Sequence, residues 1–258
     1  MLLAERRNLI ILELQENKKV VVSELSKKFN VSEETIRRDL DKLSEEGLVV
    51  KGYGGAVLKE DYGMELPFNV RYKMNPEGKK VIAELAVQEI SNRDYISLDA
   101  SSTTVFLSRV IRGKQFEKLT VITNSVENAI TLSSAPGCEL VLSGGTLHSD
   151  SMSLMGAKAI ESISAYHVNK AFISCNGLDM ERGITEGNDE VVSMKQAIIN
   201  AAESVILLID SDKFDKVSFS QVCDISRIEM LITDRKPEDH WLESFYEKDI
   251  KVKYPGAE

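Results

Sequence analysis

The sequence predicts an α/β protein, in which a small N-terminal winged helix-turn-helix precedes a mostly parallel α/β domain. Residues 1–58 contain three short helical patterns and then two apolar runs around a glycine-rich turn at 51–55. From residue 77 onward, apolar runs alternate with amphipathic ones at the spacing of βαβ units, whose parallel strands are covered on both faces. We therefore expect a winged helix at 1–58, a linker at 59–76 and an α/β domain at 77–258.

The three N-terminal helices follow from apolar spacing and from capping residues. Apolar residues at near-helical spacing predict a helix over residues 3–15. Ser23 is placed to cap a second helix that ends at Phe29, and Ser32 is placed to cap a third helix from Glu33 to about Glu46. Apolar residues at i, i+4 and i+7 (Ile36, Leu40 and Leu43) should turn one side of the third helix inward and leave a polar, partly basic face outside.

Charge and cysteine content narrow the class of protein. The chain has 258 residues, with 32 basic and 41 acidic side chains and a net charge of −9, which excludes a generally basic nucleic-acid coat and a polybasic membrane binder. Residues 1–58 are neutral, so the whole acidic excess lies in the rest of the chain. The three cysteines (Cys138, Cys175 and Cys223) are widely spaced, as is typical of reduced thiols, and no apolar run is long enough to span a membrane. We expect a cytoplasmic protein with no membrane partner.

The third helix carries side chains suited to DNA. In a helix-turn-helix the second helix of the motif enters the major groove, where hydroxyls and cations reach base edges and phosphates. An alternative is that Arg37 and Arg38 form a solvated face paired with Glu33, Glu34 and Asp41. Asp39, acidic beside two arginines, is expected to orient an arginine or cap a helix. The candidate DNA-binding residues on this helix, the helix before it and the wing are Lys27, Lys28, Ser32, Thr35, Arg37, Arg38, Lys42, Tyr53 and Gly54.

In the second domain, polar residues follow several predicted strands. The stretch from Asp99 to Thr104 joins a strand to a helix, where hydroxyls and free amides favour an anion such as phosphate; the alternative is a simple serine or threonine N-cap. Other strand ends should converge on the same edge of a parallel sheet. The candidate ligand-binding residues are Asp99, Ser101, Ser102, Thr103, Thr104, Asn124, Ser125, Gly144, Gly145, Asn176, Gly177, Glu186, Lys195, Asp210 and Lys213.

The charged members of that set allow more than one role. Lys195 and Lys213 could each pair with a phosphate or with an acid, and Asp99, Glu186 and Asp210 could bind sugar hydroxyls or act as a general base. The three histidines have no metal-binding spacing, so no metal, cofactor or catalytic residue is predicted.

Two groups of motifs resemble a known family. The series Arg6, Ile10, Leu14, Ser32 and Thr35-Ile36-Arg37-Arg38-Asp39-Leu40, with Gly54-Gly55-Ala56, resembles the helix-turn-helix of DeoR-type transcriptional regulators. The stretches 99–104, 123–125, 144–145, 177–179 and 210–214 resemble the sensor domain of that family, with Ser101 where Gly is usual and Asp212 where Ser is usual. The resemblance implies a sensor fold similar to ribose-5-phosphate isomerase and glucosamine-6-phosphate deaminase, with phosphorylated sugars as effectors.

The expected function is a sequence-specific DNA-binding repressor of a sugar-metabolism operon, controlled by a phosphorylated sugar or a related metabolite. An alternative is a sugar-phosphate isomerase or deaminase with an accessory DNA-binding module, although no histidine or second acid is placed recognisably for proton transfer around Asp99. A third is a purely protein-binding winged helix, which would show no salt-dependent DNA affinity. Because a neutral module joined to an acidic domain should bind DNA weakly alone, we expect at least a homodimer on a double-stranded operator.

Overall fold

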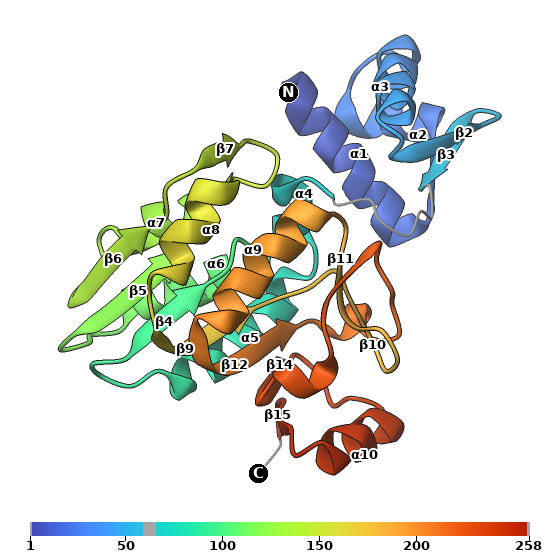
Figure 1. Ribbon diagram of the computed structural model, residues 1–258. Helices are drawn as coiled ribbons and strands as arrows, with labels where there is room; N and C mark the ends of the chain where they lie inside the picture. Colours follow the sequence, from blue (N-terminus) through green and yellow to red (C-terminus); the bar gives the residue numbers. More distant parts are fainter. Residues whose placement is uncertain (1, 59–65, 257–258) are drawn as a thin grey trace. The chain divides into compact units, whose positions relative to one another are not determined.

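The computed structural model describes residues 2–58 and 66–256 and divides the chain into two compact units, Met1–Met74 and Asn75–Glu258 (Figure 1). Within the range that the sequence assigns to a linker, residues 59–65 lie outside the described residues. Residues Phe68–Lys73 form helix α4, and Val70 of this helix is buried in the core of the first unit. Helix α5 of the second unit begins at Pro76.

The described part of the first unit combines helices with a small antiparallel sheet of strand order β1-β3-β2. Its core contains Ile36, Leu40 and Leu43, which confirms the predicted inward stripe of the third helix. Its elements are α1 (Leu3–Asn17), β1 (Lys19–Val21), α2 (Val22–Phe29), α3 (Glu33–Glu45), β2 (Val49–Gly52) and β3 (Gly55–Leu58), followed by α4.

The two predicted helix caps have different outcomes. Ser32 caps α3 as predicted, since its Oγ accepts a hydrogen bond from the Thr35 amide at 3.2 Å. The prediction for Ser23 is wrong, because α2 begins at Val22, one residue before Ser23. The N-cap residue is Val21, whose side chain forms no capping hydrogen bond. Strand β1 runs directly into α2, and the Val22 amide donates to the carbonyl of Gly54 in the wing at 2.8 Å. A backbone contact from the wing thus satisfies the first amide of the helix.

The second unit is built on a seven-stranded sheet of order β15-β14-β12-β9-β4-β5-β6, in which every strand pair is parallel. This confirms the predicted mostly parallel α/β domain. Its elements are α5 (Pro76–Ala86), η1 (Val87–Glu89), β4 (Tyr95–Leu98), α6 (Ser102–Gly113), β5 (Leu119–Thr123), α7 (Val126–Leu132), β6 (Cys138–Leu142), β7 (Thr146–His148), β8 (Ser153–Met155), α8 (Ala157–Ser164), β9 (Val168–Ile173), β10 (Gly177–Asp179), β11 (Gly183–Glu186), α9 (Asp189–Asn200), β12 (Ala202–Ile209), η2 (Ser211–Lys213), β13 (Ser220–Cys223), η3 (Ile225–Arg227), β14 (Met230–Thr233), α10 (Asp239–Glu247) and β15 (Lys251–Lys253).

Helices cover the sheet on both faces. Helices α8 and α9 pack over one face, where they share an apolar core with β9 and β12, and α5 and α6 pack against each other on the opposite face (Figure 1). From β4 the chain proceeds to β5 and β6 on one side, and it then returns to place β9 on the other side of β4. The carboxyl ends of β4 and β9 therefore form a topological switch point, where open α/β sheets bind ligands.

Two small antiparallel sheets stand beside the main sheet, one of order β10-β11-β13 and one formed by the β7–β8 hairpin. The sequence analysis predicts neither of them. Their strands are three or four residues long, too short to show a period-2 pattern of alternating apolar and polar residues.

Candidate functional site

The basic residues of α3 lie on its exposed face. The Arg37 guanidinium is paired with Glu33 at 2.6 Å, and that of Arg38 is paired with Glu34 at 3.3 Å, with side chains 52% and 78% exposed. These contacts are the solvated ion pairs that the alternative interpretation expects. Each exposed pair at i,i+4, however, stabilises a helix by only about 0.3–0.5 kcal/mol. Such weak pairs leave both arginines available to a more highly charged partner.

The remaining candidates of the first unit are also at its surface. Lys27 and Lys28 lie in the last turn of α2, where the Lys28 amine contacts Glu13 at 2.5 Å, and the Lys42 amine contacts Glu45 at 3.1 Å. Ser32 and Thr35 bind each other through their hydroxyls at 2.9 Å. Tyr53, fully exposed, and Gly54, with a φ of +76° and open space around it, form the tip of the wing.

Asp39 is the buried exception on α3. Its carboxylate accepts from Arg6 of α1 through two contacts, Nε at 2.5 Å and Nη2 at 3.2 Å, and Arg7 Nε lies 3.6 Å away. Asp39 is 1% exposed and Arg6 is 8% exposed. The acid therefore orients an arginine, as the sequence analysis expects, and it ties α1 to α3.

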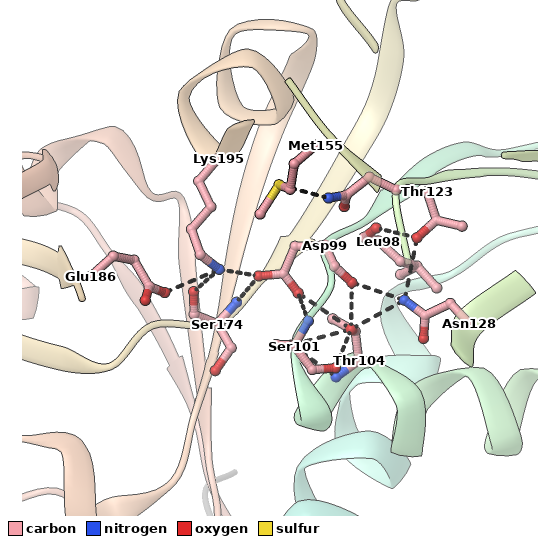
Figure 2. Close-up of polar contacts among 11 residues, drawn as sticks. Leu98, Asp99, Ser101, Thr104, Thr123, Asn128, Met155, Ser174, Glu186 and Lys195 are labelled. Atoms are coloured by element: carbon pink, nitrogen blue, oxygen red, sulfur yellow. Dashed lines mark hydrogen bonds and ion pairs between the residues drawn. The ribbon is translucent and has the colours of Figure 1, made fainter. Parts of the chain in front are cut away.

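In the second unit, a polar network occupies the switch point between β4 and β9 (Figure 2). Asp99 follows β4 and is buried. Its Oδ1 accepts from the Ser101 amide at 3.0 Å, and its Oδ2 accepts from the Ser174 amide at 2.9 Å and from the Lys195 amine. The carboxylate thus joins the ends of two strands to α9.

Lys195 is held entirely by protein groups. Besides Asp99, its amine contacts the Ser174 carbonyl at 2.7 Å and Glu186 at 3.3 Å, so all three of its protons have acceptors (Figure 2). Burial lowers the pKa of Lys195, but the two carboxylates outweigh burial and raise the pKa above its ordinary value. Of the two roles left open, pairing with an acid is the one seen here, and this lysine organises the site without a free donor.

The start of α6 is built by its own hydroxyls. Ser101 caps the helix by accepting from the Thr104 amide at 3.1 Å, and the Thr104 hydroxyl lies 2.8 Å from the Asp99 carbonyl. Ser101 is therefore an N-cap, as the alternative interpretation expects. Ser102 and Thr103, the first two helical residues, are buried, and their amides have no acceptor among the described residues. These two amides, at the positive end of a helix, are suited to an anion.

At the ends of β5 and β6, the candidates divide between capping and packing. Ser125 caps α7 by accepting from the Asn128 amide at 3.2 Å, and the Asn124 side-chain amide donates to the Leu154 carbonyl at 3.2 Å. Gly144 is exposed. Gly145 has a φ of +121°, and a Cβ there would lie 2.5 Å from the Met155 carbonyl oxygen, so only glycine fits under the β7–β8 hairpin.

The last candidates lie beyond β9 and β12. Asn176 is half-buried and its amide donates to the Thr185 carbonyl at 3.1 Å, while Gly177 packs so closely that a Cβ would lie 2.3 Å from the Lys216 carbonyl oxygen. Asp210 is buried at the start of η2, and Lys213 is half-buried with no ion-pair partner in the described part of the chain. Lys213 is thus the basic candidate of this unit whose charge is not already neutralised.

Several residues that position this network escape prediction from the sequence. Asn128 of α7 donates to the Asp99 carbonyl at 2.8 Å (Figure 2). It also accepts from Ser108 at 2.9 Å. Thr123, within a stretch that the sequence analysis does name, donates through its hydroxyl to the Leu98 carbonyl at 2.7 Å. Ser174 acts through its backbone alone. The only sign of Asn128 in the sequence is that a polar residue stands among apolar ones in a helix. Ser174 contributes only backbone atoms, and these leave no signal in a sequence.

Among residues 2–58 and 66–256, no three histidine, cysteine, aspartate or glutamate side chains are grouped as a metal site. None of the helices in the same residues has the length and apolar character needed to cross a membrane.

Comparison with known families matches both units. Residues 74–235 match the DeoR C-terminal sensor domain, and residues 6–61 match the DeoR-like helix-turn-helix domain. The chain is 36% identical to the HTH-type transcriptional regulator YulB of Bacillus subtilis, over 98% of this chain and 96% of that protein. It is 36% identical to the transcriptional repressor GlcR of B. subtilis (90% and 89%) and 28% identical to the glycerol-3-phosphate regulon repressor of Escherichia coli (90% and 91%).

Among solved structures, a D-ribose-5-phosphate isomerase aligns with 54% of this chain and 54% of its own, at 17% identity and a TM-score of 0.40.

Proposed function

Because the chain belongs to the DeoR family of transcriptional regulators, we propose that it represses a sugar-metabolism operon and releases its operator when a phosphorylated sugar binds the second unit. The names of its relatives describe regulators of transcription, one of them of a glycerol-3-phosphate regulon, and none of the relatives compared above is named as an enzyme.

The DNA-binding role of the first unit is supported by the charge and exposure of α3. Arg37 and Arg38 are restrained only by weak ion pairs to glutamates one turn earlier, and a phosphate or a guanine edge can replace those partners. Ser32 and Thr35 stand beside them with exposed or half-exposed hydroxyls. We assign base or phosphate contacts to these four residues, and backbone contacts to Lys27, Lys28, Lys42 and the wing tip at Tyr53 and Gly54.

The effector-binding role of the second unit rests on one observation, the pair of unused amides at the start of α6 beside the switch point. In this proposal a phosphate lies on the amides of Ser102 and Thr103, and Lys213, which has no ion-pair partner among the described residues, supplies the counter-charge. Asp99, Glu186 and Lys195 position the end of β4 against β9 and α9, because each already binds another protein group.

We also propose that the chain works as a homo-oligomer of at least two copies in the cytoplasm. The first 58 residues carry no net charge and the rest of the chain is acidic, so one copy should hold DNA weakly and linked copies should hold it by avidity. Free thiols at Cys138, Cys175 and Cys223 fit a reducing compartment.

The test is a fluorescence-anisotropy titration of the purified chain on the DNA upstream of its own gene. It is run at two salt concentrations, against unrelated competitor DNA, with and without ribose 5-phosphate, glucosamine 6-phosphate or glycerol 3-phosphate. Specific, salt-sensitive binding that one ester abolishes supports the proposal. Equal affinity for operator and competitor at both salt concentrations would overturn it, and turnover of an ester by the protein would favour the enzyme alternative. Light scattering that gives a monomer at micromolar concentration would overturn the oligomer.

A further inference from the structure

Two buried oxygen atoms near the proposed effector site have no hydrogen-bond partner among the described residues. One is the side-chain carbonyl oxygen of Asn124, after β5, and the other is the hydroxyl of Ser143, after β6. The two residues are 1% and 2% exposed. A buried polar atom without a partner costs about 1–3 kcal/mol, so at these two strand ends a bound group is expected, either water or part of a ligand.

The two oxygen atoms belong to one surface. Thr123 is in register with Leu98 on one side and with Leu142 on the other, so the next residues, Asp99, Asn124 and Ser143, are neighbours across three parallel strands. Residues in register point to the same face of a parallel sheet. That face is the one covered by α8 and α9, since Asp99 binds Lys195 of α9 (Figure 2) and Asn124 contacts Met155 beside α8.

The orientation of the Asn124 amide is fixed by its neighbours. Its nitrogen donates to the Leu154 carbonyl at 3.2 Å, and the Leu154 amide donates to the Asn124 backbone carbonyl at 2.8 Å. Turning the side-chain amide over would place two carbonyl oxygens together. The unpaired atom of Asn124 is therefore an acceptor, and it requires a donor.

The charged residues next to this pair offer nothing to a ligand, because Asp99 and Lys195 are saturated by protein groups. A carbonyl oxygen beside a carboxylate also repels a phosphate. The atoms left open suit a neutral hydroxyl, which can donate to Asn124 and bind Ser143.

On the basis of the proposed function, we infer that Asn124 and Ser143 form a subsite for the neutral hydroxyl groups of the effector, separate from the place where its phosphate binds. The effector class is then a polyol or sugar phosphate whose hydroxylated part reaches the ends of β5 and β6. A compound with phosphate alone leaves this subsite empty.

The test compares Ser143→Ala with Ser97→Ala in the full chain. Ser97 of β4 is a matched control, because its hydroxyl is also buried and unpaired but lies inside the sheet, in register with buried Ile122 and Ala171, and not at a strand end. Neither substitution removes a side-chain hydrogen bond, so both variants should keep the wild-type Tm. Calorimetric titration then measures the affinity for inorganic phosphate, glycerol 3-phosphate, ribose 5-phosphate and glucosamine 6-phosphate.

We expect Ser143→Ala to weaken the tightest ester by about 2- to 12-fold, the loss of one hydrogen bond, and to leave the affinity for inorganic phosphate unchanged. Ser97→Ala should change neither. Equal ester affinity in the two variants, or an equal loss for the ester and for inorganic phosphate, would overturn the hydroxyl subsite while the effector proposal stands. If no ester binds the wild-type chain better than inorganic phosphate, the proposed effector class itself fails.

A crystal structure with the tightest ester gives an independent measurement. An ester hydroxyl within hydrogen-bond distance of Asn124 Oδ1 and Ser143 Oγ is expected. An ordered water that bridges the two atoms both with and without the ester would overturn the inference.

Discussion

Asp39→Ala should destabilise the first unit far more than a surface substitution would. The substitution removes the acceptor of the two Arg6 contacts and leaves a guanidinium buried that is only 8% exposed in the native chain. Breaking a buried pair by removing one partner costs about 3–5 kcal/mol. A unit of 74 residues has a free energy of unfolding of about 4–11 kcal/mol in total, so much of its stability should be lost.

The double variant Arg6→Met with Asp39→Leu separates charge burial from lost packing. Replacing both partners by apolar residues of similar volume is often neutral, so the double variant should recover at least half of the loss. Amide hydrogen exchange of peptides from α1 and α3 measures the first unit. Trp241, the single tryptophan and a buried residue of the second unit, provides a fluorescence control that should not change. A loss below about 1 kcal/mol in the single variant, or a double variant no more stable than it, would refute the assigned role of the pair.

Three other outcomes are expected. Arg38→Ala should weaken operator binding by about 5- to 150-fold in anisotropy titrations while Arg182→Ala, in the second unit, has little effect; equal affinities would remove α3 from the interface. Lys195→Met should lower the free energy of unfolding by about 3–5 kcal/mol. Because the folded-state pKa of Lys195 is raised, the difference from wild type should stay constant in denaturation from pH 6 to 9 and shrink above pH 10; growth of the difference there would contradict the ion-pair network. At pH 8, iodoacetamide should modify half-buried Cys138 before Cys175, whose pKa is raised by burial, and mass spectrometry showing the reverse order would contradict that burial.

Local rules predicted most of the regular structure. The cap at Ser32, the inward stripe of α3 and the mostly parallel sheet follow from capping and from periodicity, which depend on neighbours in the sequence. Ser23 shows where such rules stop. The helix begins before Ser23, and its first amide, that of Val22, is satisfied by Gly54, more than thirty residues away; no local pattern contains that contact.

The location of the candidate site could be predicted from the sequence, but its hydrogen bonds and ion pairs could not. The strand ends at Asp99 and Asn124 could be brought together by assuming a parallel sheet, and the structure does bring them together. Whether Lys195 faces a ligand or an acid depends on how far α9 is rotated over the sheet, which spacing along one chain does not determine. The burial of Asn128 depends on contacts with α6, which the sequence of α7 alone does not reveal.

The contact between Asp99 and Lys195 can form only after both residues have been synthesised. The two residues are 96 positions apart, and at a synthesis rate of about 5–20 residues per second the lysine is added roughly 5–20 s after the aspartate. A nascent chain that ends before α9 therefore holds the whole DNA-binding unit and the start of α6, but it lacks the cation that neutralises Asp99. In the proposed function, control by an effector therefore depends on a residue that is synthesised long after the DNA-binding unit, and a chain truncated before Lys195 should lack that control.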